Sequence, residues 1–137
     1  MGGGPVAEVV AAVRIVAPPS SLDTAAWPGG ATAVRVAPDE VLVVDALEVN
    51  PPDPEAIVFP DTSWVRHRLP PADGAAVMAG AASWPPPTAG VGQGMVAGVA
   101  AKLVVGPEEW WLLVQGVVAA EFGARIDAVL SAVEGGV

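Results

Sequence analysis

Prolines and glycines divide this chain into short segments, and they limit its fold more than any other feature of the sequence. The 137 residues include 15 prolines and 16 glycines, and prolines gather in residues 17–30, 46–55 and 84–87. Proline fixes φ and lacks an N–H, so these stretches are predicted to be loops or extended connections. Two segments without internal proline have a helical composition, 71–83 and 116–134. The apolar runs elsewhere are short enough for strands.

These apolar runs are predicted to form antiparallel strands. Valine-rich runs favour strands, and a proline followed by Asp or Glu is typical of a tight turn. The predicted strands are one within residues 9–16, a hairpin of 33–36 with 41–44, short strands at 56–59 and 63–69, and a second hairpin of 95–104 with 109–115.

The two predicted helices complete an α+β fold of antiparallel hairpins. Residues 71–83 begin with a proline in the first turn and are rich in alanine. Residues 116–134 are amphipathic, and one stripe carries Val118, Phe122, Ile126, Val129, Leu130 and Val133. A chain of this length is expected to be one domain, 1–137. Within it, 1–30 are an N-terminal strand and a Pro/Gly-rich loop, and 31–134 are the core.

Charge and residue counts argue against several classes of function. Six basic residues against fifteen acidic ones give a net charge of −9, so nucleic acid and anionic membranes would repel the chain. There is no cysteine and one histidine, so no transition-metal site is predicted. The sequence has no long apolar run, and its N-terminus lacks the basic region of a signal peptide. We therefore expect a cytoplasmic protein with no membrane partner.

The single histidine lies in the segment 59–70, FPDTSWVRHRLP, near a serine and an aspartate. On an extended strand Ser63 and His67 are roughly 13 Å apart, whereas a serine–histidine hydrogen bond needs about 3 Å. The spacing therefore disfavours a local triad of Asp61, Ser63 and His67. We predict that His67 is partly buried and hydrogen-bonded.

Two other patterns resemble ligand sites, but we interpret both of them as structural features. The glycines of GVGQGMVAG, residues 90–98, fit neither a dinucleotide nor a Walker spacing, and a strand rather than a helix follows them. We interpret this run as a flexible entry into the second hairpin. The adjacent carboxylates Asp39-Glu40 and Glu108-Glu109 are interpreted as solvated turn charges.

The apolar content indicates that another chain covers part of the surface. Hydrophobic residues make up 53 % of the sequence, and with glycine the apolar share is about 65 %, above the usual 45–50 %. Strands 41–44 and 110–115 are apolar on both faces, and such strands are normally covered on both sides. Trp64, Arg66 and Arg68 share a strand face that is a solvated face, a contact surface or a small-anion site. The candidate contact residues are Trp64, Arg66, Arg68, Trp84 and Trp110.

The order of these segments resembles a known family. Residues 36–44, VAPDEVLVV, resemble a "GPDEWLLV" segment of sarcosine oxidase gamma subunits, which are relatives of the folate-binding domain of the glycine-cleavage aminomethyltransferase. Residues 57–69 are similar to the family's Asp-x-Ser strand, and 71–83 falls where its "G-x-x-A-x-x-V-L" helix would. Residues 93–104, 111–114 and the closing helix resemble its C-terminal half. The likeness covers roughly 31–133, although Ala82-Ser83-Trp84-Pro85 departs from the family's Gly-Cys-Pro-like turn.

This resemblance implies a non-catalytic accessory subunit of a heterotetrameric, flavin-dependent amine oxidase or demethylase. It implies that larger flavoprotein subunits are the partners, that they hold FAD, FMN, tetrahydrofolate and NAD, and that this chain binds no cofactor and carries no catalytic or metal-binding residue. Two alternatives stay open: a free-standing folate- or ligand-binding protein, and a homo-oligomeric structural protein.

Overall fold

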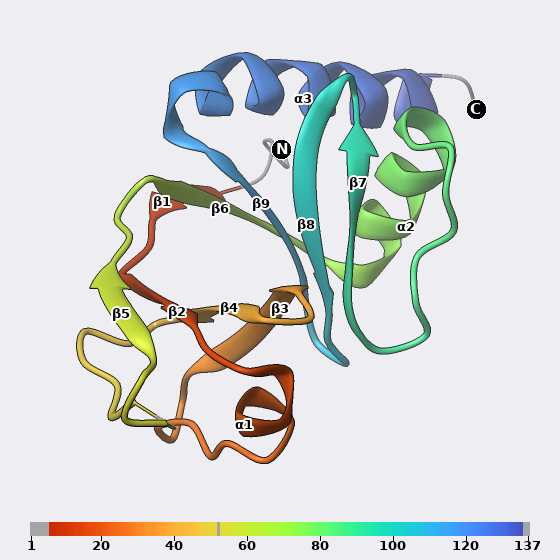
Figure 1. Cartoon of the computed structure of the whole chain (residues 1–137). Helices are drawn as coiled ribbons and strands as arrows, with labels where there is room; N and C mark the ends of the chain where they lie inside the picture. The colour runs from red at the N-terminus through yellow and green to blue at the C-terminus, as the bar shows by residue number, and fades with distance from the viewer. Residues whose placement is uncertain (1–5, 52, 136–137) are drawn as a thin grey trace. The chain divides into compact units, whose positions relative to one another are not determined.

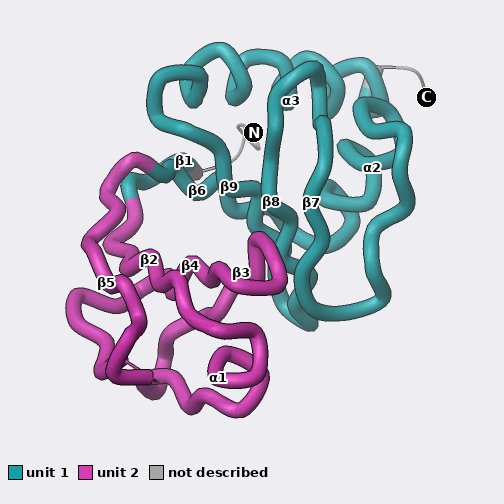
Figure 2. Tube along the Cα trace, in the orientation of Figure 1, with its two compact units in different colours: residues 1–9, 64–137 teal, residues 10–63 magenta. Residues whose placement is uncertain are grey.

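The computed structural model describes residues 6–51 and 53–135 (Figure 1). The N-terminal residues 1–5, on which the signal-peptide interpretation rests, lie outside them. Two compact units are distinguished (Figure 2): unit 1 comprises Met1–Val9 and Trp64–Val137, and unit 2 comprises Val10–Ser63. Within the described residues, no helix combines the length and apolar character that crossing a membrane requires.

The described part of unit 1 contains a five-stranded antiparallel sheet and two helices. The strand order is β1 (Val6–Val9), β6 (Trp64–Leu69), β9 (Trp110–Gln115), β8 (Val99–Val105) and β7 (Gly90–Val96). Helix α2 (Pro71–Ala81) follows β6, and the 3₁₀ turn η1 (Gly116–Val118) leads from β9 into α3 (Ala119–Gly135). Both helices pack against one face of the sheet, where their apolar side chains join those of the strands.

The core of unit 1 follows the alternation of the strands. Leu103 and Leu112 point to the helices and meet Phe122 and Ile126 of α3, and all four side chains are fully buried. Burial of each such side chain contributes about 1.5–3 kcal/mol. The stripe predicted for the C-terminal helix thus provides the contacts of α3, except that Val133 near its end is exposed.

The described part of unit 2 is a four-stranded antiparallel sheet with one short helix. The strand order is β3 (Thr32–Ala37), β4 (Glu40–Val44), β2 (Ala12–Val16) and β5 (Ile57–Pro60). Helix α1 (Pro19–Asp23) contributes Leu22 to a core that includes Val13, Ile15, Val41 and Val43. Strand β5 is at one edge of this sheet.

Unit 2 is an insertion between two neighbouring strands of unit 1. The chain leaves unit 1 after β1 and returns at β6, and these two strands pair in antiparallel register, with Val9 opposite Val65. The single apolar segment predicted at 9–16 is therefore two strands, β1 and β2, that belong to different sheets.

The α+β class and the antiparallel hairpins are confirmed, but the predicted strand 95–104 is wrong. Residues 95–104 contain a turn, because Ala97 and Gly98 have φ of 50° and 78° and join β7 to β8. Two consecutive positive φ values are typical of a two-residue hairpin turn, which Asn-Gly signals far more strongly than Ala-Gly. Helix α1 was also not predicted, because five residues between prolines carry little helical pattern.

Candidate functional site

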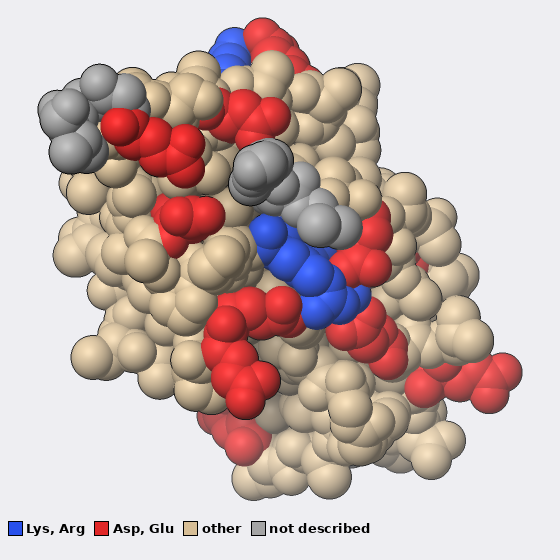
Figure 3. Space-filling model, turned by 180° about the vertical axis from the view of Figure 1, so that it is seen from behind, with Lys and Arg blue, Asp and Glu red and all other residues tan. Residues whose placement is uncertain are grey.

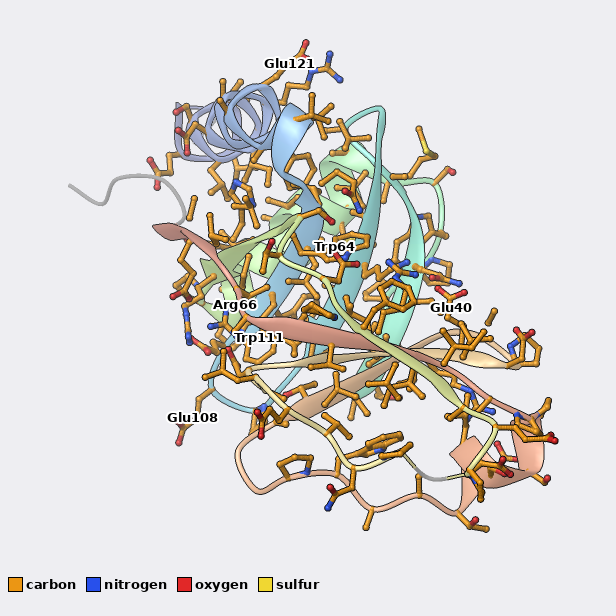
Figure 4. The ribbon with its side chains drawn as sticks, turned by 60° about the vertical axis from the view of Figure 1, so that its left-hand side comes forward. Glu40, Trp64, Arg66, Glu108, Trp111 and Glu121 are labelled. Carbon is orange, nitrogen blue, oxygen red and sulfur yellow. The ribbon has the colours of Figure 1, made fainter. Side chains whose placement is uncertain are left out.

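A cluster of charged and aromatic side chains crosses three strands of the sheet in unit 1. Arg66 Nε donates to Glu8 Oε1 at 3.0 Å, and Arg68 donates to both Glu8 and Glu109. The indole of Trp111 donates to Glu109 at 2.7 Å. The guanidinium carbon of Arg66 lies 4.3 Å from the centroid of the Trp111 ring, and the two side chains lie side by side in Figure 4.

The carboxylates of this cluster neutralise its two arginines. Hydrogen bonds from Arg68 and Arg66 lower the pKa of Glu8. Glu8 therefore keeps its negative charge at pH values where an ordinary glutamate is already protonated. Figure 3 shows the basic side chains of one face gathered mainly in a short strip with acidic side chains beside it. Because the two guanidinium groups already bind carboxylates and stack on an indole, the small-anion interpretation of this strand face loses support.

The five predicted contact residues differ in exposure. Trp64 is 6 % exposed and Arg66 is 3 % exposed, so little of either side chain is available to another chain. Arg68, Trp84 and Trp110 are partly exposed. Whether any of the five contacts a partner stays a prediction.

Trp84 and Trp110 each lie against glycines of unit 1. The Trp84 indole covers Gly92 and Gly94 of β7, and its Nε1 donates to the Met95 carbonyl at 2.9 Å. A Cβ on Gly94 would lie 2.5 Å from that nitrogen. Residues 90–96 of the glycine run therefore form strand β7, where the missing side chains of Gly92 and Gly94 make room for an indole, and residues 97–98 form the turn that follows. The sequence had predicted a flexible entry here instead of a strand.

His67 is fully buried under α3. Its ring makes an edge-on contact with Phe122, with centroids 5.2 Å apart, and a Cβ on Gly123 would lie 3.4 Å from its Nε2. Burial lowers the pKa of His67, against the opposing effect of the Ala119 and Leu112 carbonyls. Its Nδ1 has no hydrogen-bond partner among the described residues. His67 is thus a core side chain with a lowered pKa, and it is more buried than predicted.

The serine and aspartate of the same segment belong to unit 2 and bond to each other. Ser63 Oγ donates to Asp61 Oδ1 at 2.5 Å, and Asp61 Oδ2 accepts from Arg14 at 3.0 Å. Arg14 also pairs with Glu40. Asp61 therefore holds the end of β5 against β2, and the hydroxyl of Ser63 is directed to a carboxylate rather than to an imidazole.

A pocket that the sequence did not reveal lies on the sheet of unit 1. It has a volume of about 450 Å³, and its lining includes Trp64, Gln93, Met95, Lys102 and Gln115. Lys102 Nζ lies 5.2 Å from the centroid of the Trp64 ring and donates to Gln93 Oε1 at 3.0 Å. An ammonium and two amides in an apolar pocket suit a small molecule with an anionic or carbonyl group. Gln93 pairs with Lys102 across the unpredicted turn at Ala97, so the pocket could not be predicted from the sequence.

The described residues contain no group of three His, Cys, Asp or Glu side chains arranged to hold a metal ion.

Comparison with known proteins places the fold. No protein-family model matches the sequence, and no curated protein matches it either. Among solved structures, the chain is similar to a chain of the heterotetrameric sarcosine oxidase from Corynebacterium sp. U-96 in complex with pyrrole 2-carboxylate. The TM-score is 0.68 at 13 % sequence identity, over 96 % of this chain and 87 % of that one. At this identity the likeness shows a shared fold.

Proposed function

We propose that this chain is a non-catalytic accessory subunit of a multi-subunit, flavin-dependent amine oxidase of the sarcosine oxidase kind. The observation that carries the proposal is the similarity to a chain of a heterotetrameric sarcosine oxidase. It extends over nearly the whole of both chains, so the two are of comparable length and the match is not to one domain of a large flavoprotein. One fold can carry many different functions, so the proposal also depends on the chemistry of the side chains.

The chemistry of the side chains supports an accessory role. The histidine is buried, the arginines of β6 bind carboxylates, and Ser63 bonds to Asp61. Catalysis by acid–base or nucleophilic groups needs such side chains within reach of a substrate and of one another. In this proposal the flavins, tetrahydrofolate and NAD bind to larger partner subunits in the cytoplasm.

Gene deletion in the native host tests this proposal. Cells without the chain should lose flavin-dependent oxidation of N-methyl amino acids such as sarcosine, and the plasmid-borne wild-type gene should restore it. Native gels stained for the oxidase activity would show whether the loss follows from failed assembly. Oxidase activity and mobility that are unchanged in the deletion strain would contradict the proposal.

The pocket of unit 1 favours a second candidate, a free-standing folate- or ligand-binding protein. Trp64 lines the pocket beside Lys102, so a bound ligand should change tryptophan fluorescence. Titration with tetrahydrofolate should then give a saturable change that Lys102→Met weakens at least tenfold and Glu108→Lys, on an exposed turn, does not. A flat titration curve in the wild-type protein rules this candidate out for tetrahydrofolate.

A further inference from the structure

Unit 2 exposes an apolar patch at the edge of its sheet. All four residues of the edge strand β5 are exposed. The exposed fraction is 61 % for Ile57, 36 % for Val58 and 40 % for Phe59, and it is 84 % for the nearby Leu47. We call these four residues the β5 patch. They are half of the eight large hydrophobic side chains that are exposed in the described part of the chain. Single exposed hydrophobic residues are ordinary, whereas a contiguous group marks an interaction surface.

The patch borders a shallow groove. The loop after β4 and the strand β5 enclose a volume of about 320 Å³, lined by Leu47, Val49, Val58, Phe59 and the polar Glu48 and Asn50. Apolar side chains from the loop 47–50 and from β5 thus form the walls of one depression. Such a depression fits an apolar side chain projecting from a partner surface.

The strand edge itself is poorly suited to pairing with another strand. β5 has four residues and ends at Pro60, which has no N–H, and the N–H of Asp61 already donates to the Ala12 carbonyl at 2.9 Å. Short edge strands and edge prolines are devices that prevent strand addition. Recognition at this edge therefore uses side chains in the groove rather than an added strand.

The charge around the patch selects the kind of partner. Residues 10–63 contain two arginines and eight carboxylates. Arg14 pairs with Glu40 and Asp61, and Arg35 pairs with Asp23. The carboxylates within four residues of the patch in sequence are Asp45, Glu48, Asp53, Glu55 and Asp61. Arg14 lies opposite Phe59 in the sheet, but its charge is already matched by Glu40 and Asp61. A second copy of the chain would place these acidic groups opposite each other, whereas a basic surface would be attracted.

We propose that the β5 patch is the surface on which this chain docks to a larger partner subunit, through an apolar projection flanked by Lys and Arg side chains. The proposal rests on the proposed function, because it assigns the partner to the same complex. It assigns the contact to unit 2, whereas the tryptophans and arginines suggested by the sequence belong to unit 1.

Four tagged variants expressed in the native host test the assignment. Leu47→Ser with Phe59→Ser removes apolar contacts, and Glu48→Lys with Glu55→Lys reverses the charge. The matched controls are Val117→Ser, at a valine that is 92 % exposed in unit 1, and Glu108→Lys, on an exposed turn of unit 1 (Figure 4). All substituted side chains are exposed, so circular dichroism and the urea midpoint should match those of the wild type. The readout is the molar ratio of flavin-containing subunits to tagged chain after purification, measured at low and high salt.

The expected result is a loss of at least tenfold in that ratio for both patch variants, wild-type ratios for both controls, and a lower wild-type ratio at high salt. If the patch variants recover the flavin-containing subunits as well as the wild type does, the β5 patch is not the docking surface. The accessory-subunit proposal would then remain intact. A wild-type chain that recovers no flavin-containing subunit would remove both proposals. If the wild-type chain self-associates and the Leu47/Phe59 variant does not, the patch binds a second copy of the chain. That result would overturn the proposal of a basic partner.

Discussion

At the scale of single residues, the burial of His67 has a measurable thermodynamic consequence. Burial lowers the pKa of the folded state below the unfolded value of about 6.5. Between these two pKa values the unfolded chain binds a proton that the folded chain does not. The contribution of His67 to the free energy of unfolding is therefore fully present above pH 6.5. It decreases as the pH drops below that value, with a slope of up to about 1.4 kcal/mol per pH unit.

We predict that His67→Gln abolishes this slope between pH 6.5 and 5, because the sequence has no other histidine. Urea unfolding followed by tryptophan fluorescence measures it, since four of the five tryptophans lie in unit 1. The control is Phe122→Leu, which loses packing against the same ring. It should lower stability by on the order of 1 kcal/mol at every pH and keep the slope. A wild-type curve that is flat over this range contradicts the assignment of a neutral, buried histidine.

Gly94 offers a second test on the scale of a side chain. The Gly94→Ala methyl group would lie 2.5 Å from the indole nitrogen of Trp84, so the indole must move and its bond to the Met95 carbonyl must weaken. We expect a loss of about 1–3 kcal/mol and a red shift in tryptophan emission. Gly29→Ala, where no atom lies within 4 Å, should leave stability unchanged or slightly raised. Equal stability of the two variants would contradict the packing of Trp84 on β7.

At the scale of elements, the turn between β7 and β8 carries strain that a substitution can relieve. Ala97 has a φ of 50°, a conformation that alanine adopts less readily than glycine or asparagine. Ala97→Asn should therefore raise the free energy of unfolding by about 0.5–1 kcal/mol, measured by urea denaturation. Ala97→Val should lower it, because a β-branched residue is strained at this φ. The opposite order of the two variants would mean that the turn is not formed.

The turn between β7 and β8 illustrates which elements could be predicted from the sequence and which could not. The β3–β4 and β8–β9 hairpins follow from proline-acid turns between valine-rich runs, and α2 and α3 follow from composition and periodicity. The turn at Ala97-Gly98 has no Asn or Asp to mark it, and the break between β1 and β2 lies inside one valine-rich run, at Val10 and Ala11. The pocket at Lys102 was missed because it depends on the register across that turn.

The contact surface predicted at Trp64 and Arg66 stays a prediction, and the partners of these side chains within the chain could not be predicted from the strand alone. An aromatic and basic strand suggested a contact surface at Trp64 and Arg66, but Glu8, 58 residues from Arg66 in sequence, binds that arginine. Pairing over such a distance is set by the insertion of unit 2 between β1 and β6. Conversely, Ile57-Val58-Phe59 was predicted correctly as a strand, but periodicity gives no sign that it is an edge strand exposed on both faces.

At the scale of the whole molecule, the apolar excess of the sequence has a specific location. Strands β4 and β9 are apolar on both faces, as predicted, and Val41–Val44 and Leu112–Val114 are buried within this chain. These seven residues leave no apolar surface for a partner to cover, whereas Trp110 and Trp111 of β9 are partly exposed. Half of the large hydrophobic side chains that are exposed in the described residues lie in the β5 patch, within a unit in which carboxylates outnumber arginines four to one. An accessory chain that docks through this unit accounts for both features.

Native mass spectrometry of the tagged wild-type chain, purified under mild conditions from its own host, tests the accessory role most directly. The account predicts a hetero-oligomer in which this chain is present in a fixed ratio with larger, flavin-containing subunits. A chain recovered as a monomer, or as an assembly made of copies of itself, would contradict it.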